Sequence, residues 1–196
     1  MASPVVANIL YGPGVVWFRT VDSTFNPSSL DAVPLGNNLP SPWNRFGFTE
    51  GPTSFQYERE EKDIMSNESL APVIRFPTME KATIGFTVIE VTPGLVNIAA
   101  GLDFATTTGS GWEQWVTGDV KTLAERMYCI ESTYRNAAGV EYPVRLYIWR
   151  GTAKITNSLE WEREGQPKLQ VEVGALGDLQ RIAGQRLFAI RKLKET

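Results

Sequence analysis

The chain has 196 residues, a formal net charge of −3 and a hydrophobic fraction of 42%, values typical of one globular domain rather than a disordered chain. It contains no histidine and one cysteine, Cys129, which excludes thiolate–imidazole catalysis and disfavours zinc sites and a disulfide framework. The acidic balance provides no global positive field for nucleic acid, and no apolar run is long enough to span a membrane. Because the N-terminus also lacks the features of a secretory signal, we expect a protein made in the cytosol.

The first part of the chain predicts a strand followed by an arm. Residues 15–21, VVWFRTV, are β-branched and aromatic and favour a strand. Residues 23–42 contain four prolines, which exclude a regular helix or a central strand. We expect an extended proline-rich arm there, either a surface loop or a segment that binds a partner. Three aromatic residues, Trp43, Phe46 and Phe48, are expected to anchor its end in the core.

An acidic segment follows, between a weakly alternating stretch at 54–61 and an apolar stretch at 71–76 that ends at Pro77. Its acids are Glu58, Glu60, Glu61, Asp63 and Glu68. Strict strand alternation places Glu58 and Glu60 on one face and Glu61 and Asp63 on the other, unless a bulge or turn intervenes.

These acids are compatible with several roles. A solvated strand edge is the commonest role of such a cluster. A glycosidase pair needs two carboxyl groups across a cleft, and nothing around these acids indicates a sugar pocket. A calcium site built from Asp63, Asn67 and Glu68 lacks the spacing of a calcium loop. A surface that repels another polyanion is the fourth role.

The middle of the chain predicts one strand, one helix and an insertion. In residues 81–91, KATIGFTVIEV, the apolar side chains recur with period two, which is typical of a half-buried strand. Thr92 and Pro93 then favour the start of a short helix that ends near Gly101. Residues 102–125 are polar and glycine-rich, and we expect a variable loop or an exposed hairpin there.

The C-terminal part favours an antiparallel meander with one buried face. The expected strands cover residues 127–133, 144–150, 153–163, 168–174 and 185–192, with tight turns at Gly151 and around Gly165. The whole pattern predicts one domain, 1–196, that is mainly β: an antiparallel β-sandwich or half-barrel with one short α-helix and extended arms.

The segment WNRFGFTEGPTSFQYEREEKDIMSNESLAPV and the following KATIGFTVIEVTPGLVNIAAG resemble the core of bacteriophage major tail tube proteins. The shared elements are a Trp-x-x-x-Gly turn, a Thr-Glu-Gly, a charged strand, a Ser-x-Glu-Ser segment and a threonine-rich strand leading to a short helix. The tail segment GALGDLQRIAGQRLFAIR is similar to the closing strand of that family. Together these segments cover roughly half of the chain.

The resemblance implies a structural virion protein whose hexameric rings stack into the tail tube, with inner strands of all subunits forming one barrel around a lumen. A tape-measure protein and then DNA pass through this lumen without specific binding, and tail-tip and tail-terminator proteins contact the tube. The resemblance implies no cofactor, metal or membrane. On this hypothesis the five acids above line the lumen and repel DNA. The candidate subunit-interface residues are Trp43, Arg45, Phe46, Trp112, Trp115, Arg186 and Arg191.

Two other hypotheses remain open from the sequence. One is a β-sandwich that binds carbohydrate or host surfaces through Trp112 and Trp115. The other is an enzyme with paired acids, which would have to work without histidine.

Overall fold

The computed structural model describes residues 10–34, 37–65, 72–103, 107–114, 116, 122–135, 139–158 and 167–192. The elements are β1 (Leu10–Thr20), the 3-10 helix η2 (Pro27–Leu30), β2 (Asn44–Arg45), β3 (Thr49–Met65), β4 (Pro72–Val88), α1 (Pro93–Ala99), β5 (Thr107–Gly109), β6 (Trp112–Gln114), β7 (Arg126–Arg135), β8 (Glu141–Ile155), β9 (Leu169–Ala175) and β10 (Phe188–Lys192). The described part of the chain is therefore mainly β with one α-helix, which confirms the expected fold class.

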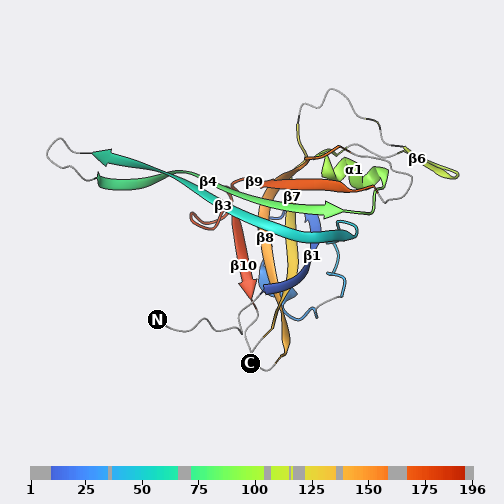
Figure 1. The fold of residues 1–196 in the computed structure, drawn as a ribbon, viewed down its shortest axis with the longest axis horizontal. Coiled ribbons are helices and arrows are strands. Elements are labelled where there is room, and N and C mark those ends of the chain that lie inside the picture. Colours follow the sequence, from blue (N-terminus) through green and yellow to red (C-terminus); the bar gives the residue numbers. More distant parts are fainter. Residues whose placement is uncertain are drawn as a thin grey trace.

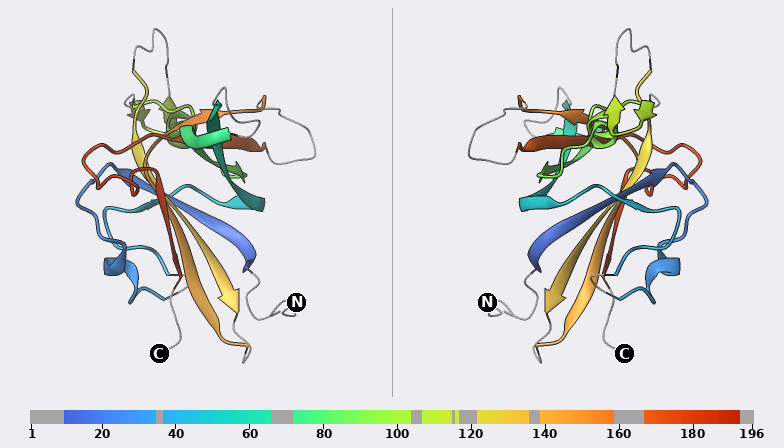
Figure 2. Two further views of the ribbon diagram at one scale, coloured as in Figure 1. Left: turned by 90° about the vertical axis from the view of Figure 1, so that its left-hand side faces the viewer. Right: turned by 90° about the vertical axis from the view of Figure 1, so that its right-hand side faces the viewer.

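Eight strands form one antiparallel sheet that does not close on itself. Its order is β2-β1-β7-β8-β9-β4-β3, and β10 pairs with β8 beside this path. Figure 1 shows β3, β4 and β9 running across the direction of β1, β7, β8 and β10. Figure 2 shows the second group fanning out on one side of the first. The sheet thus folds over itself as a half-barrel, with its core between the two groups of strands.

Strand β8 joins the two groups, and here the sequence prediction was wrong. A turn was expected at Gly151, but β8 continues from Glu141 to Ile155 without a break. Val144 to Ile148 pair with β10, whereas Gly151 to Ile155 pair with β9. A Cβ atom at Gly151 would lie 2.9 Å from the carbonyl oxygen of Gly174. The glycine therefore permits close approach of two backbones where the sheet folds over, which is a different use of glycine from a turn.

The main core fills the space between the two groups of strands and is covered by α1. Period two in β4 is confirmed, because its apolar set is buried together with that of β9. This set comprises Ala82, Ile84, Phe86, Val88, Leu169, Val171 and Val173.

Helix α1 starts where the sequence predicts it. The Thr92 hydroxyl accepts a hydrogen bond from the Leu95 amide at 3.3 Å, and Pro93 occupies the first turn. Gly101, at φ +70°, follows the helix, and a Cβ atom there would lie 2.4 Å from the carbonyl oxygen of Ala153. The glycine thus lets the helix end against β8.

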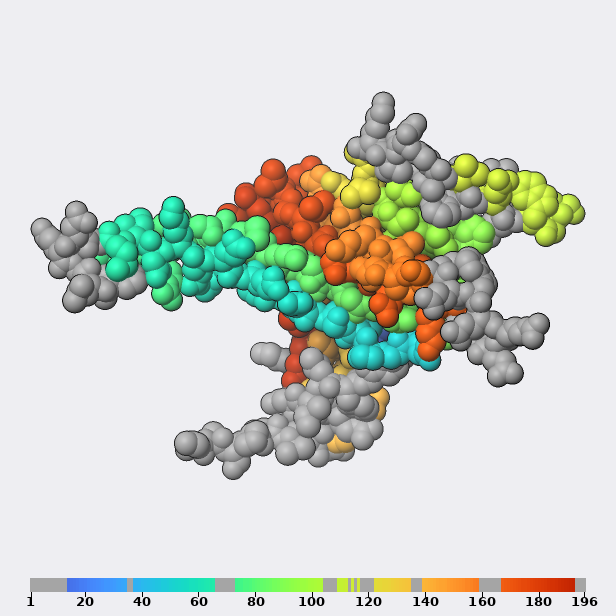
Figure 3. Space-filling model, turned by 45° about the horizontal axis from the view of Figure 1, so that its top comes forward, coloured from blue at the N-terminus to red at the C-terminus, as the bar shows by residue number. Residues whose placement is uncertain are grey.

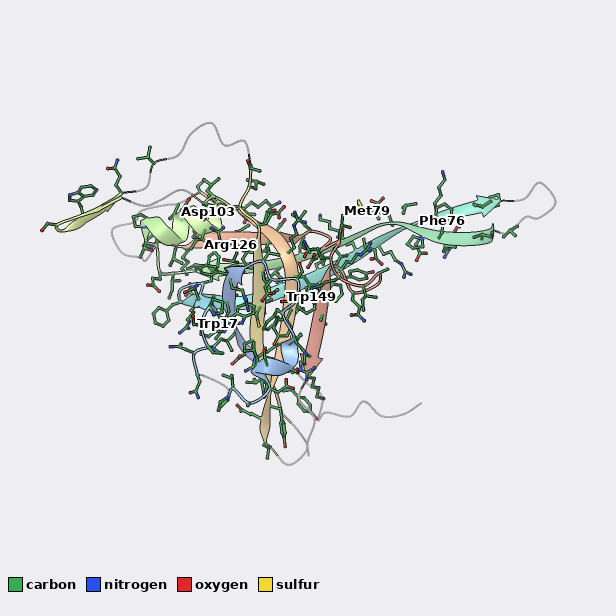
Figure 4. The ribbon with its side chains drawn as sticks, turned by 180° about the vertical axis from the view of Figure 1, so that it is seen from behind. Trp17, Phe76, Met79, Asp103, Arg126 and Trp149 are labelled. Carbon is green, nitrogen blue, oxygen red and sulfur yellow. The ribbon has the colours of Figure 1, made fainter. Side chains whose placement is uncertain are left out.

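A second, aromatic core lies on the other side of β1, β7 and β8, and residues 23–42 cover it. Figure 4 labels two of its members, Trp17 and Trp149, on the sheet. Leu30, at the end of η2, and Leu39 are buried against these aromatic rings. The proline-rich segment therefore contains a helical turn and packs on its own chain, in addition to any contact with a partner.

Strands β3 and β4 form one long hairpin instead of the shorter extended segments that the sequence favoured. The strand continues through Pro77, because the register shifts there: Glu60 pairs with Met79 and Glu61 pairs with Pro77. A proline at a β-bulge loses no ladder hydrogen bond, so the strand need not end.

Candidate functional site

The outer part of the β3–β4 hairpin projects from the body as an arm. Strand β9 pairs with β4 only between Thr83 and Val88, so from Ala82 outward the described parts of β3 and β4 pair with each other alone. From Tyr57 to Met65 the strand extends about 26 Å at ~3.3 Å per residue. The arm stands clear of the body in ribbon and space-filling views (Figures 1 and 3). We use "arm" below for residues 57–65 and 72–82.

The register divides the arm into two chemically different faces. The ion-paired face carries Tyr57, Arg59, Glu61, Asp63, Arg75 and Glu80. The open face carries Glu58, Glu60, Lys62, Ile64, Ile74, Phe76, Met79 and Lys81. The extra residue of the bulge at Pro77 belongs to β4, so alternation along β3 is kept and the acids remain split between the faces.

Both arginines of the ion-paired face are bound by carboxylates of the same face. The guanidinium of Arg75 binds both carboxylate oxygens of Asp63, with Nε–Oδ1 at 2.7 Å and a second nitrogen 3.0 Å from Oδ2. Glu61 forms ion pairs with Arg59 and, at 3.6 Å, with Arg75. The hydrogen bond from Arg75 lowers the pKa of Asp63 below its usual range. Tyr57 donates to Glu80 Oε1 at 2.8 Å, which raises the pKa of the phenol.

The open face lacks such pairing and carries apolar side chains. Glu58 accepts a hydrogen bond from Gln56 at 2.6 Å, but no ion pair joins Glu60, Lys62 or Lys81 to a residue that the structure describes. Between these charges lie Ile64, Ile74, Phe76 and Met79, whose exposed fractions are 47%, 55%, 38% and 49%. Apolar and unpaired charged groups thus alternate on the one face.

The predicted acidic cluster is therefore neither continuous nor strongly charged. Two of its acids lie on each face, and Glu68 lies outside the described residues. Within residues 57–65 and 72–82, five acidic side chains stand beside four basic ones. No group of three metal-binding side chains occurs in the described part of the chain. Asn67 and Glu68, two of the three residues considered for a calcium site, lie outside the described residues.

A groove of about 690 Å³ lies at the root of the arm, between the ion-paired face and β10. Its walls include Tyr57 and Glu80 from the arm and Arg186, Phe188 and Ile190 from the C-terminal segment. The Phe188 ring packs edge-on against Tyr57, with centroids 5.3 Å apart. The lining of the groove therefore combines a pair of aromatic rings with one charged side chain of each sign.

The candidate interface residues fall into different environments. Trp43 and Phe46 are buried in the cores of their own chain, as expected for residues that anchor the proline-rich segment 23–42. Little of either ring is therefore left for a neighbour. Phe48 was expected to be an anchor too, but it is 56% exposed and lies under the guanidinium of Arg45. Trp112 is exposed on the β5–β6 hairpin of the predicted insertion, and Trp115 lies outside the described residues.

Arg191 belongs to a set of arginines that bind the proline-rich segment. It forms a bidentate ion pair with Asp31, which lowers the pKa of that carboxyl. The Arg181 guanidinium donates to the carbonyl oxygens of Asp22 and Phe25, and Arg186 donates in turn to the Arg181 carbonyl at 3.2 Å. The C-terminal segment therefore holds residues 22–31 on the sheet.

Sequence reasoning missed the most buried member of this set, Arg145 on β8. Its guanidinium donates to Glu131 at 2.7 Å and to the carbonyl oxygens of Leu30 and Val33 at 2.5 and 2.9 Å. The available signal was an arginine inside the otherwise apolar strand VRLYIWR. A charged residue in a buried strand requires an opposite charge and further acceptors nearby.

Comparison with known proteins identifies the family. A comparison with curated proteins finds no significant match. No helix in the described ranges is long and apolar enough to cross a membrane. The family described as "Phage tail tube protein" matches residues 7–185, which is most of the chain. This chain therefore belongs to the phage tail tube protein family, and it is a structural component of a phage tail.

Proposed function

We propose that copies of this chain assemble into hexameric rings, that the rings stack into the tail tube, and that DNA leaves the virion through the lumen. The tube contacts a tape-measure protein inside and tip and terminator proteins at its ends. The chain takes no cofactor and has no enzymatic role. The family supports the structural role, and the number of subunits per ring is the part to be tested.

The observation that carries the proposal is the open sheet. In the described residues β3 pairs only with β4, and β10 pairs only with β8, so each presents an edge without a strand partner. An unpaired edge is an aggregation hazard unless another chain covers it. A head-to-tail contact between different surfaces of identical copies closes into a ring when its rotation permits. An open half-barrel is therefore suited to completion by neighbours.

A passage for DNA also has to avoid binding it. Phosphate binding scales with the lysines and arginines that can contact the backbone. On the ion-paired face both arginines, Arg59 and Arg75, are held by carboxylates of the same arm. We infer that pairing of cations, more than an excess of acids, keeps this surface from adhering to DNA.

Negative-stain electron microscopy of the purified protein over a concentration series, with light scattering, tests the proposal. Hollow six-fold rings or stacked tubes support it, and rings of another symmetry would correct the subunit number. A protein that stays monomeric at every concentration and binds glycans through Trp112 would overturn it in favour of a carbohydrate-binding module. If the protein catalyses a reaction and the Glu61→Gln variant loses this activity while it still assembles, the non-enzymatic role is overturned.

A further inference from the structure

We propose that the β5–β6 hairpin is a binding platform for neutral carbohydrate, with the Trp112 ring as the surface on which a sugar ring stacks. This inference goes beyond the proposed function, because a subunit of the tube needs no such ligand. The platform is confined to one hairpin, so it binds whether the protein is free or assembled. Sugar binding by the assembled protein gives the tail tube an activity in addition to its role as a conduit.

The insertion that carries the hairpin is closed at its base. The Ala124 amide donates to the Gly101 carbonyl oxygen at 2.7 Å, which joins the two ends of the segment. Beside this bond, the buried guanidinium of Arg126 donates to the carbonyl oxygen of Leu102 and to Asp103, both at 3.0 Å. Figure 4 shows Arg126 and Asp103 next to α1, where the insertion leaves the body. The hairpin is therefore part of a looped-out segment whose two ends are fixed on the body.

The hairpin itself stands apart from the main sheet. Among the described residues, β5 and β6 pair only with each other and form a separate two-stranded sheet. Strand β6 lies at the end of the molecule opposite to the arm (Figure 1). Trp112 belongs to neither of the two cores that the described residues form. Its ring is therefore displayed on the surface and does not serve the packing of the body.

Trp112 presents one flat face of its indole ring to solvent. The residue is 53% exposed, and it pairs with Gly109 across the hairpin. A Cβ atom at Gly109 would lie 2.5 Å from the indole Nε1 and about as close to the neighbouring Cε2 and Cζ2, so the ring lies face-on against this glycine. A Cβ atom at Gly111, the other neighbour in the turn, would meet nothing within 4 Å. The hairpin thus supports one face of the ring and leaves room for a ligand at the other.

The residues around the ring favour a neutral sugar over other flat ligands. Residues 102–120 contain three acidic residues and no lysine or arginine, so a nucleic acid or an acidic sugar finds no cation there. Trp112 is also the only large apolar residue of the segment GSGWEQ, whereas protein contacts usually gather several. Ser110 lies in the turn, and Gln114 shares its side of β6 with Trp112, so a hydroxyl and an amide accompany the ring. A sugar, with a face of C–H groups and an edge of hydroxyl groups, matches an indole beside such groups.

Repetition compensates for the weak binding that a single aromatic ring provides. In the proposed tube, many copies present identical platforms to one polysaccharide chain. Once one platform is occupied, the next binds the same chain at a high effective concentration. The ligand that fits best is therefore a polysaccharide with repeated neutral sugars, and not a monosaccharide.

Biolayer interferometry with immobilised dextran, mannan and galactan tests the platform on the full chain. These polymers present glucose, mannose and galactose, and we expect binding to at least one of them. The Trp112→Ala variant should bind about tenfold more weakly, whereas Trp112→Phe, which keeps a flat ring, should lose less than about threefold. Leu123→Ala is the matched control, because Leu123 is an apolar residue of the same insertion with a similar exposed fraction, 51% against 53%. It should change binding by less than about twofold.

Several results would overturn the platform. These are no binding to any of the three polysaccharides, binding that Trp112→Ala leaves unchanged, an equal loss in Leu123→Ala, and tighter binding of single-stranded oligothymidylate. Assembly provides a separate readout, since Trp112→Ala should shift the concentration at which rings appear by less than about twofold. A tenfold rise would assign the ring to a subunit contact and overturn the platform.

The same measurements separate the platform from the proposed function. Rings that bind no polysaccharide would overturn the platform and leave the tube intact. Polysaccharide binding by rings supports both. Polysaccharide binding through Trp112 by a protein that stays monomeric supports the platform and overturns the tube.

Discussion

The buried pair between Arg145 and Glu131 permits a quantitative prediction. The two residues face each other across β7 and β8, and their side chains are 3% and 6% exposed. Arg191 of β10 lies opposite Arg145 on its other side and binds Asp31. Two arginines thus share one site, and two carboxylates with two carbonyl oxygens satisfy them.

Replacing Arg145 with Met leaves Glu131 buried without its cation and removes the donors of two carbonyl groups. Breaking a buried ion pair from one side destabilises a protein by about 3–5 kcal/mol. Because domains of this size have an unfolding free energy of about 5–15 kcal/mol, the variant should lose about a fifth or more of it. The double variant Glu131→Gln with Arg145→Met removes the stranded charge, and we expect it to recover about 1–2 kcal/mol.

Urea unfolding followed by tryptophan fluorescence measures these unfolding free energies. Trp43 and Trp149 report on unfolding because they belong to the aromatic core beneath the proline-rich segment. The exposed Arg45→Met serves as the matched control, with an expected change within about 0.5 kcal/mol. A loss below about 1 kcal/mol for Arg145→Met would refute the reasoning. So would strict additivity in the double variant, because it would mean that the two residues do not interact.

Three further predictions concern the same framework. The Arg191 guanidinium lowers the pKa of Asp31, so this ion pair stabilises the fold above the usual carboxyl pKa, and its contribution is lost as pH falls through the lowered value. The Asp31→Asn variant should therefore lose less unfolding free energy than the wild type as the pH is lowered. An unchanged dependence of stability on acidic pH would contradict this. Gly151→Ala should destabilise by about 1–3 kcal/mol, because its Cβ would meet backbone at 2.9 Å, whereas Gly174→Ala, with open space around it, should cost less in the same thermal melts. Burial raises the pKa of the Cys129 thiol far above its usual value, so it should react with a thiol reagent only on unfolding; fast labelling of native protein would count against the buried site.

The arm changes the explanation of the acidic segment. Taken along the chain, Glu58, Glu60, Glu61 and Asp63 form one acidic run. Pairing with β4 divides the run, and brings Arg75 against Asp63 from twelve residues away. Charge density along a sequence therefore overstates the charge of a surface, because the neighbouring strand supplies the counter-ions.

The sequence by itself determined the local elements. The period-two pattern in β4 and β9 selected the buried side chains, because alternate residues of a strand face opposite sides of the sheet. Thr92 and Pro93 determined the start of α1 through its capping hydrogen bond. The absence of histidine limited the available chemistry, and the motifs around Trp43 and 81–101 were sufficient to indicate the family.

Only the tertiary structure decided how these elements meet. From the sequence, Gly151 was compatible with a turn or with the close approach of two backbones. The short distance to the Gly174 carbonyl oxygen on β9 shows that it is a close approach. Pro77 was compatible with a strand end or a bulge, and the register against β3 decided for the bulge. The role of the buried Arg145 could be recognised only from its partners, Glu131 on β7 and the carbonyl oxygens of Leu30 and Val33. In each case the deciding partner is remote in the chain, so no local pattern could contain it.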